Sequence, residues 1–159
     1  MPTNILLADD HCILRQGLRR ILESYPGFII VAEAGSGRQA VELAREHQPD
    51  VAIVDIAMGE LNGIDATAQI VRHSPRTAVI ILSMYGDERY IVRALNAGAK
   101  GYLLKDSVEQ DLVQAIQSVC VDRPFFSPAI TQVLAERQAS ASVPGHVEDR
   151  YDLLTSRER

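Results

Sequence analysis

The sequence predicts an α/β fold in which a doubly wound, five-stranded parallel sheet carries helices on both faces and is followed by one extra helix. Two observations lead to this prediction. Short apolar runs rich in β-branched residues alternate with stretches whose apolar residues recur at helical spacing. The apolar runs also contain no polar interruption, which is typical of parallel strands covered on both faces. Alternation of this kind favours a parallel sheet joined by right-handed crossovers.

The strands are expected at residues 4–8, 28–32, 51–55, 78–82 and 101–104. The helices between and after them are expected at about 11–24, 37–44, 64–71, 88–97 and 108–119. Ser36 and Ser107 are suitable N-caps, and Gly98 is a suitable C-terminal stop. The extra helix is expected to begin at Ser127-Pro128, since proline is common at the first helical position.

The chain divides into four predicted parts. Residues 1–121 form the α/β domain, and residues 122–138 carry the extra helix. Residues 139–152 are small and polar, as in a linker. Residues 153–159 begin like a helix, with Thr155 and Glu158 spaced as in a capping box, and then stop. This start suggests a further domain that has been cut short.

Composition excludes several classes of protein. The net charge of -5 argues against nucleic-acid binding by this segment itself, because the 16 Lys and Arg residues form no basic stripe. Two cysteines are too few for a disulfide framework. No apolar run approaches the roughly 20 residues that a membrane helix needs. These features predict a cytoplasmic protein with no membrane contact.

Polar side chains gather at the carboxyl ends of the predicted strands. Asp9 and Asp10 follow the first strand, Asp55 ends the third, Ser83 follows the fourth and Lys105 follows the fifth. In open α/β sheets these ends line one cleft. Three carboxylates and one lysine leave an excess of negative charge that a hard cation such as Mg²⁺ would balance. The set suits transfer of a phosphoryl group to Asp55 as nucleophile.

Each of these residues also has an ordinary interpretation. A lone aspartate at a strand end is more often a turn former or a helix cap. Asp10 could cap the first helix, Ser83 could begin a turn and Lys105 could be a solvated surface charge. The functional interpretation depends on all of them reaching one edge of one sheet. The four histidines are scattered and show no metal-ligand spacing with another His or Cys, so none is expected to bind a metal.

Residues 4 to about 120 resemble the receiver domains of two-component response regulators. Asp9, Asp10, Asp55, Ser83 and Lys105 match the signature positions of that family. The runs NAGAKGY (96–102) and LLKD (103–106) resemble the NarL/FixJ subfamily, and the tail DLLTSRER (152–159) is similar to the opening of a LuxR-type helix-turn-helix domain. The resemblance implies a flavodoxin-like sheet of order 2-1-3-4-5.

The resemblance also implies roles for individual residues. Asp55 would be the phosphoacceptor and Asp10 a direct Mg²⁺ ligand, with Asp9 acting through water. The backbone carbonyl of Ala57 would be a further metal ligand. Ser83 and Lys105 would bind phosphoryl oxygens.

The resemblance also implies a conformational switch and a rate of autodephosphorylation. Tyr102 would be the switch aromatic that turns inward with Ser83; its ordinary alternative is a half-buried aromatic on an edge strand. Ala57 and Tyr85 occupy positions that tune hydrolysis, and their types predict slow autodephosphorylation. Gly59 departs from the proline that the family usually has there, which would leave the loop less restrained.

The resemblance implies a regulator that accepts a phosphoryl group from a sensor histidine kinase and controls a DNA-binding output through a C-terminal domain. It would turn over no external substrate, and homodimerisation would follow phosphorylation. Three alternatives remain open at this point. They are an Mg²⁺-dependent phosphatase acting through an aspartyl phosphate, a flavodoxin-like cofactor binder and a receiver that signals as an interaction module without phosphorylation.

Overall fold

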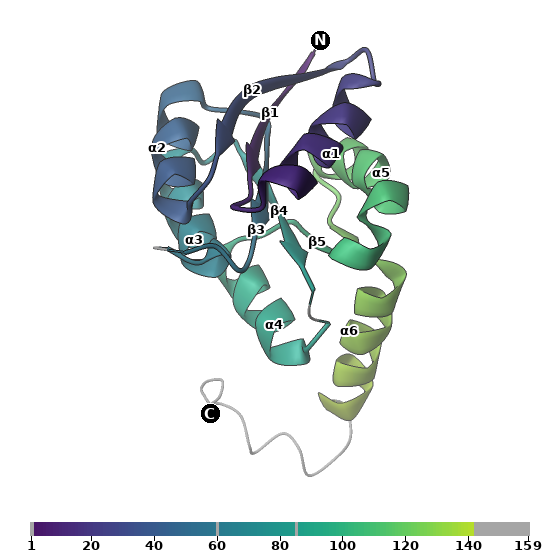
Figure 1. Cartoon of the computed structure of the whole chain (residues 1–159). Helices are drawn as coiled ribbons and strands as arrows, with labels where there is room; N and C mark the ends of the chain where they lie inside the picture. Colours follow the sequence, from purple (N-terminus) through teal and green to yellow (C-terminus); the bar gives the residue numbers. More distant parts are fainter. Residues whose placement is uncertain (1, 60, 85, 142–159) are drawn as a thin grey trace.

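The computed structural model describes residues 2–59, 61–84 and 86–141, and in this part of the chain a parallel sheet separates two layers of helices (Figure 1). The strands are β1 (Thr3–Ala8), β2 (Phe28–Ala34), β3 (Val51–Asp55), β4 (Ala78–Ser83), β5 (Gly101–Leu104) and β6 (Phe125–Phe126). The helices are α1 (Cys12–Glu23), α2 (Gly37–His47), α3 (Gly63–His73), α4 (Glu88–Ala97), α5 (Val108–Cys120) and α6 (Pro128–Ala141), with a 3₁₀ turn at Lys105–Ser107.

The sheet has the order β2-β1-β3-β4-β5-β6, and every pairing is parallel. The predicted order of the first five strands is confirmed, and so are the helices on both faces. The predicted count of five strands is one too low. β6 has only two residues, so it has no periodicity to detect, and Pro124 just before it indicates a break.

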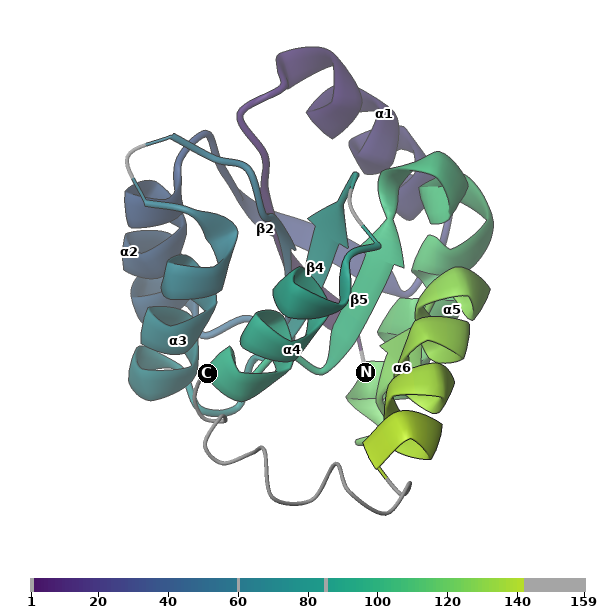
Figure 2. The ribbon, with the colours of Figure 1, turned by 90° about the horizontal axis from the view of Figure 1, so that it is seen from below.

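Two apolar cores fill the space between the sheet and its helices, and alternate strand residues enter opposite cores. Ile5 and Leu7 of β1 face α1 and α5, whereas Leu6 and Ala8 face the side covered by α2, α3 and α4. Figure 2 shows the two helix layers on either side of the sheet. This burial on both faces explains why the strands are unbroken apolar runs rather than alternating ones.

Capping residues explain where several of the helices begin and end. The Ser36 side chain accepts a hydrogen bond from the Gln39 amide, as expected of an N-cap, and Gly98 ends α4 with φ of 111°. Ser107 occupies the N-cap position of α5 but makes no capping bond, because its hydroxyl turns back to the Leu104 carbonyl across the 3₁₀ turn.

The extra helix predicted after residue 122 is α6, which continues three residues into the predicted linker, to Ala141. The remainder of the linker and the predicted helix-turn-helix start lie outside the described residues, and the division at these points stays a prediction. Among the residues that the structure describes, no helix combines the length and apolarity needed to cross a bilayer.

Candidate functional site

Asp55 lies at the carboxyl end of β3, the strand with all five residues buried. Its main chain is paired with Leu82 of β4, so the carboxyl group is presented from the middle of the sheet. The Ala57 amide donates a hydrogen bond of 3.1 Å to Asp55 Oδ1. The carboxyl group is therefore fixed by the backbone of the loop that follows it.

Asp9 and Asp10 follow β1, the neighbour of β3. Asp9 is fully buried, and its Oδ1 accepts a 2.7 Å hydrogen bond from the His11 amide. Asp9 thus also forms a turn, as its ordinary interpretation predicts. The Asp10 side chain is 35% exposed, and its Oδ1 lies 3.2 Å from His11 Nδ1. It does not cap α1, whose N-cap residue is His11.

Lys105 brings a positive charge to the two buried carboxylates from the end of β5. Its Nζ lies 3.1 Å from Asp55 Oδ1 and 4.0 Å from Asp9 Oδ2. The ammonium group is largely shielded from water, with 12% of the side chain exposed. One lysine against three carboxylates leaves the excess negative charge predicted from the sequence.

Two carboxylate oxygens among these side chains are available as ligands for a cation. Asp9 Oδ2 and Asp55 Oδ2 are buried and accept no hydrogen bond within the described part of the chain. Burial raises the pKa of Asp9, and the Asp55 charge adds to this, while the His11 amide and Lys105 act in the opposite direction. A hard cation with oxygen ligands fits this donor set, because it would satisfy both oxygens and compensate the charge.

His11 is the residue that the sequence analysis missed. Its Nδ1 lies 3.3 Å from Asp9 Oδ1, 3.2 Å from Asp10 Oδ1 and 3.8 Å from Asp55 Oδ2. The four side chains together form the acidic cluster of the site, with potential ligand atoms within 4.8 Å of one another. The spacing between histidines does not connect His11 with this site. Its position directly after Asp10 in the sequence does.

Ser83 ends β4, and Tyr102 lies on the neighbouring strand β5, opposite Ile81. Both are fully buried, and a side-chain hydrogen bond joins them. Burial raises the pKa of Tyr102, and the Ser83 hydrogen bond opposes this rise. Tyr102 is neither half-buried nor on an edge strand, because it is fully buried and pairs with Phe126 of β6. The ring points inward.

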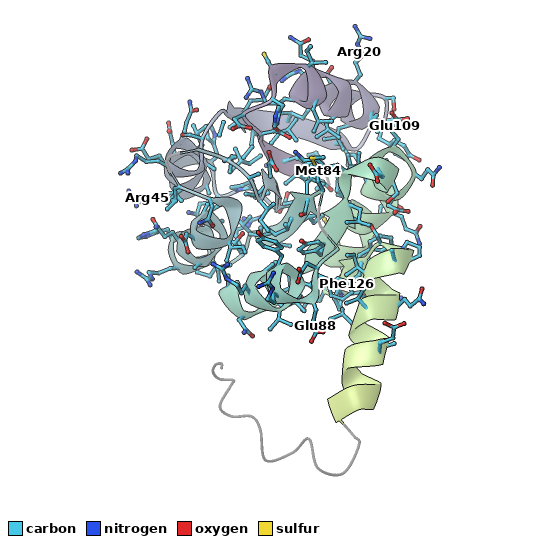
Figure 3. All side chains as sticks on the ribbon, turned by 60° about the horizontal axis from the view of Figure 1, so that its bottom comes forward. Arg20, Arg45, Met84, Glu88, Glu109 and Phe126 are labelled. Carbon is cyan, nitrogen blue, oxygen red and sulfur yellow. The ribbon has the colours of Figure 1, made fainter. Side chains whose placement is uncertain are left out.

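The loops around the site contain the remaining predicted residues. Ala57 is exposed, and Tyr85 lies outside the described residues. Met84, directly after Ser83, is 72% exposed and lies near the centre of the view in Figure 3. A side chain at Gly59 would meet open space, whereas a Cβ at Gly63 would lie 2.6 Å from the Cα of Ile56. Glycine is thus required sterically at Gly63 and not at Gly59.

A sequence model of the response regulator receiver domain matches residues 5–117. The chain is 34% identical over 166 residues to the transcriptional regulatory protein DegU of Brevibacillus brevis, covering 97% of this chain and 70% of that protein. It is 36% identical over 157 residues to the nitrate/nitrite response regulator protein NarP of Escherichia coli (strain K12), covering 99% of this chain and 71% of that protein.

Solved structures give the same result. A LuxR-family two-component response regulator from Aurantimonas sp. SI85-9A1 superposes with a TM-score of 0.83 at 37% identity, covering 87% of this chain and 99% of that one. The receiver domain of the putative response regulator NarL from Mycobacterium tuberculosis superposes with a TM-score of 0.72 at 33% identity, covering 77% of this chain and 98% of that one.

Proposed function

Because this chain belongs to the response-regulator receiver family, among the NarL/LuxR-type regulators that control transcription, we propose that Asp55 is its phosphoacceptor and that a sensor histidine kinase is the phosphodonor. The observation that carries the proposal is the environment of Asp55. Its carboxyl group is buried, Lys105 lies 3.1 Å from one oxygen, and the other oxygen accepts no hydrogen bond among the described residues.

Transfer would be an in-line displacement. An Asp55 carboxylate oxygen forms a bond to phosphorus while the bond between phosphorus and the kinase histidine nitrogen breaks, and that nitrogen keeps the bonding electrons. Lys105, whose Nζ lies 3.1 Å from Asp55 Oδ1, would pair with a phosphoryl oxygen in the product. The Ala57 amide, already bonded to Asp55 Oδ1, holds the carboxyl group in one orientation before the reaction.

The acidic cluster would hold Mg²⁺ for this reaction. Asp10, whose side chain is 35% exposed, is proposed as a direct ligand together with Asp55 and the Ala57 carbonyl, and the buried Asp9 is proposed to act through water. When bound, Mg²⁺ supplies charge neutralisation for the phosphoryl oxygens. His11 would have to leave the cluster, and its side chain, 64% exposed, has room to do so.

Ser83 and Tyr102 are proposed as the switch. The Ser83 hydroxyl would bind a phosphoryl oxygen on Asp55, and Tyr102, buried and hydrogen-bonded to Ser83, would be held inward by that arrangement. A phosphoryl group can only shift the conformational equilibrium through contacts that differ between the two states. The contact with Ser83 is a difference of that kind.

The output is proposed to lie beyond the receiver. The net charge of -5 over the 159 residues does not favour DNA binding by this segment itself, so a C-terminal helix-turn-helix domain would provide it. Phosphorylation is proposed to favour a homodimer, which matches two-fold symmetric DNA half-sites.

A regulator of transcription that is phosphorylated by a sensor kinase would act in the cytoplasm. It would turn over no external substrate, and the comparisons do not favour the phosphatase, cofactor-binding or phosphorylation-independent alternatives.

The direct test is the intact mass of the chain after incubation with Mg²⁺ and acetyl phosphate. We expect one added phosphoryl group in the wild type, none in Asp55→Asn, and one in the control Asp65→Asn, which changes an exposed aspartate on α3. Omitting Mg²⁺ should prevent the addition. An unmodified wild type across several phosphodonors, or an equal adduct in Asp55→Asn, would contradict the proposal.

A further inference from the structure

Arg15 joins the acidic loop to the neighbouring strand. From the first turn of α1, its Nη1 donates a 2.6 Å hydrogen bond to the carbonyl of Asp9 and a 3.2 Å bond to the carbonyl of Ala34. Its Nε donates to Glu33 Oε1 at 3.1 Å. The guanidinium group therefore bonds to the carboxyl ends of both β1 and β2.

These bonds fix Asp9 from a second direction. The Asp9 side chain is already bonded to the His11 amide, and Arg15 now holds the Asp9 carbonyl, which belongs to the peptide group leading into Asp10. The orientation of that peptide group sets where the Asp10 backbone begins. Hydrogen bonds that involve a charged group are shorter and stronger than bonds between neutral groups.

Arg19 provides a natural comparison. It lies one turn further along α1, pairs with the other carboxylate oxygen of Glu33 and forms a 2.9 Å ion pair with Glu23. The bonds described for its guanidinium group go to these two glutamates and not to the Asp9 carbonyl. Arg15 and Arg19 thus share Glu33 and differ in their bond to the acidic loop.

We propose that Arg15 is a positioning residue for the cation site, holding the Asp9 carbonyl so that the carboxylates of Asp9 and Asp10 keep the geometry that a divalent cation requires. This proposal rests on the proposed function. Arg15 touches neither the cation nor the phosphoryl group and acts through the backbone of the loop. Groups that orient metal ligands in this way contribute substantially to metal affinity.

Charge and geometry make opposite predictions for Arg15. Removing a positive charge near three carboxylates would, by Coulomb's law alone, strengthen the binding of Mg²⁺. Removing the bond that orients the loop would weaken it. The same charge is lost when Arg19 is replaced, but the Asp9 carbonyl keeps its partner. A loss of Mg²⁺ affinity that occurs only in Arg15 variants would therefore come from the lost orientation of the loop and not from the lost charge.

The test compares Arg15→Gln and Arg19→Gln with the wild type. Calorimetry gives the Mg²⁺ dissociation constant without any reaction, and the rate of phosphorylation by acetyl phosphate is followed across Mg²⁺ concentrations. Arg15→Gln should weaken Mg²⁺ binding on the order of tenfold, as is usual when a group that orients metal ligands is lost. Its phosphorylation rate should recover at saturating Mg²⁺, and Arg19→Gln should bind Mg²⁺ at least as tightly as the wild type.

Arg15→Lys separates the hydrogen-bonding fork from the charge, since lysine cannot reproduce the planar set of donors. We expect weaker Mg²⁺ binding here too, and this variant decides the question if Arg15→Gln does not fold. Wild-type affinity in both Arg15 variants, or an equal loss in Arg19→Gln, would overturn the proposal. A wild type that binds Mg²⁺ but is not phosphorylated would contradict the proposed function and leave the comparison of affinities valid.

Discussion

Asp9 combines full burial with an oxygen that accepts no hydrogen bond from the described residues, beside the charge of Asp55. Burial raises its pKa above the ordinary 3.8, so the folded protein holds the Asp9 proton more tightly than the unfolded chain does. The stability contributed by protonated Asp9 is therefore present below its ordinary pKa and is lost as pH rises through the raised value. At neutral pH, ionised Asp9 costs stability.

Asp9→Asn should accordingly stabilise the chain at pH 7 without divalent cations. The expected gain is about 1 kcal/mol, because the neutral amide removes a buried charge beside Asp55, and leaving such a group incompletely hydrogen-bonded costs at least that much. Asparagine can still accept the bond from the His11 amide through its side-chain oxygen. The free energy of unfolding, measured with urea at pH 7 and again near pH 4, checks this, because the gain should shrink as wild-type Asp9 becomes protonated.

The matched control is Asp106→Asn, which removes the charge of an exposed carboxylate next to Lys105 in the chain. It should change the unfolding free energy little at either pH. A destabilised Asp9→Asn, or a gain that grows on acidification, would show that burial is not the main influence on Asp9.

Residue types at the site were predictable because strand ends are easily recognised. Asp9, Asp55 and Lys105 each follow an apolar run, and parallel strands bring such ends to one edge. The spacing between metal ligands in the sequence gives no signal for His11, because its relevance comes from the turn that Asp9 makes with its amide. The Arg15 bond to a carbonyl was equally hidden, because the acceptor is backbone and carries no mark in the sequence.

Among the elements, β6 and α6 show where sequence patterns stop being informative. The Ser127 hydroxyl accepts a bond from the Leu104 amide, and the Ser127 amide donates to the Tyr102 carbonyl, so the turn before α6 is joined to β5. Figure 3 labels Phe126 just before α6. These pairings join residues that are distant in the chain, and two residues of strand cannot reveal them. The helix that follows was predicted because a proline marks its first position.

α6 is anchored by Ile130, which is fully buried in the core that also contains Tyr102. Ile130→Ala should lower the unfolding free energy by about 2–4 kcal/mol, since it removes buried methyl groups and leaves a cavity. Thr131→Ala, at the next and exposed position of the same helix, is the control and should cost far less. Chemical denaturation of both variants measures the difference. A loss below 1 kcal/mol for Ile130→Ala would mean that α6 adds little to the fold.

At the scale of the whole molecule, the site exists only when the sheet is assembled. Asp9, Asp55, Ser83 and Lys105 come from the ends of four strands and are brought together by the order of those strands. The order was predictable only through the family resemblance, because alternating strands and helices alone allow several orders. A ligand of this site binds the folded chain and not the unfolded one.

Mg²⁺ should consequently raise the thermal stability of the entire chain. At a concentration of 100 times the dissociation constant, mass action predicts a gain of about 2.7 kcal/mol. For a chain of this size that corresponds to a rise of roughly 5–10 °C in Tm. Differential scanning calorimetry with and without Mg²⁺ checks it, with Asp10→Asn expected to lose most of the rise. An unchanged wild-type Tm at millimolar Mg²⁺ would contradict a specific site.

The sheet ends differently at its two sides. Beyond β5 it ends in a strand of two residues, with α6 packed against both β5 and β6. At the other side β2 presents seven residues, among them Ile29, with 45% of its surface exposed. Among the described residues no strand pairs with the outer edge of β2, and an unpaired strand of this length is a template for pairing between chains. Any intermolecular sheet formed at high concentration should therefore grow from β2, which makes it the edge to protect when the protein is engineered for solubility.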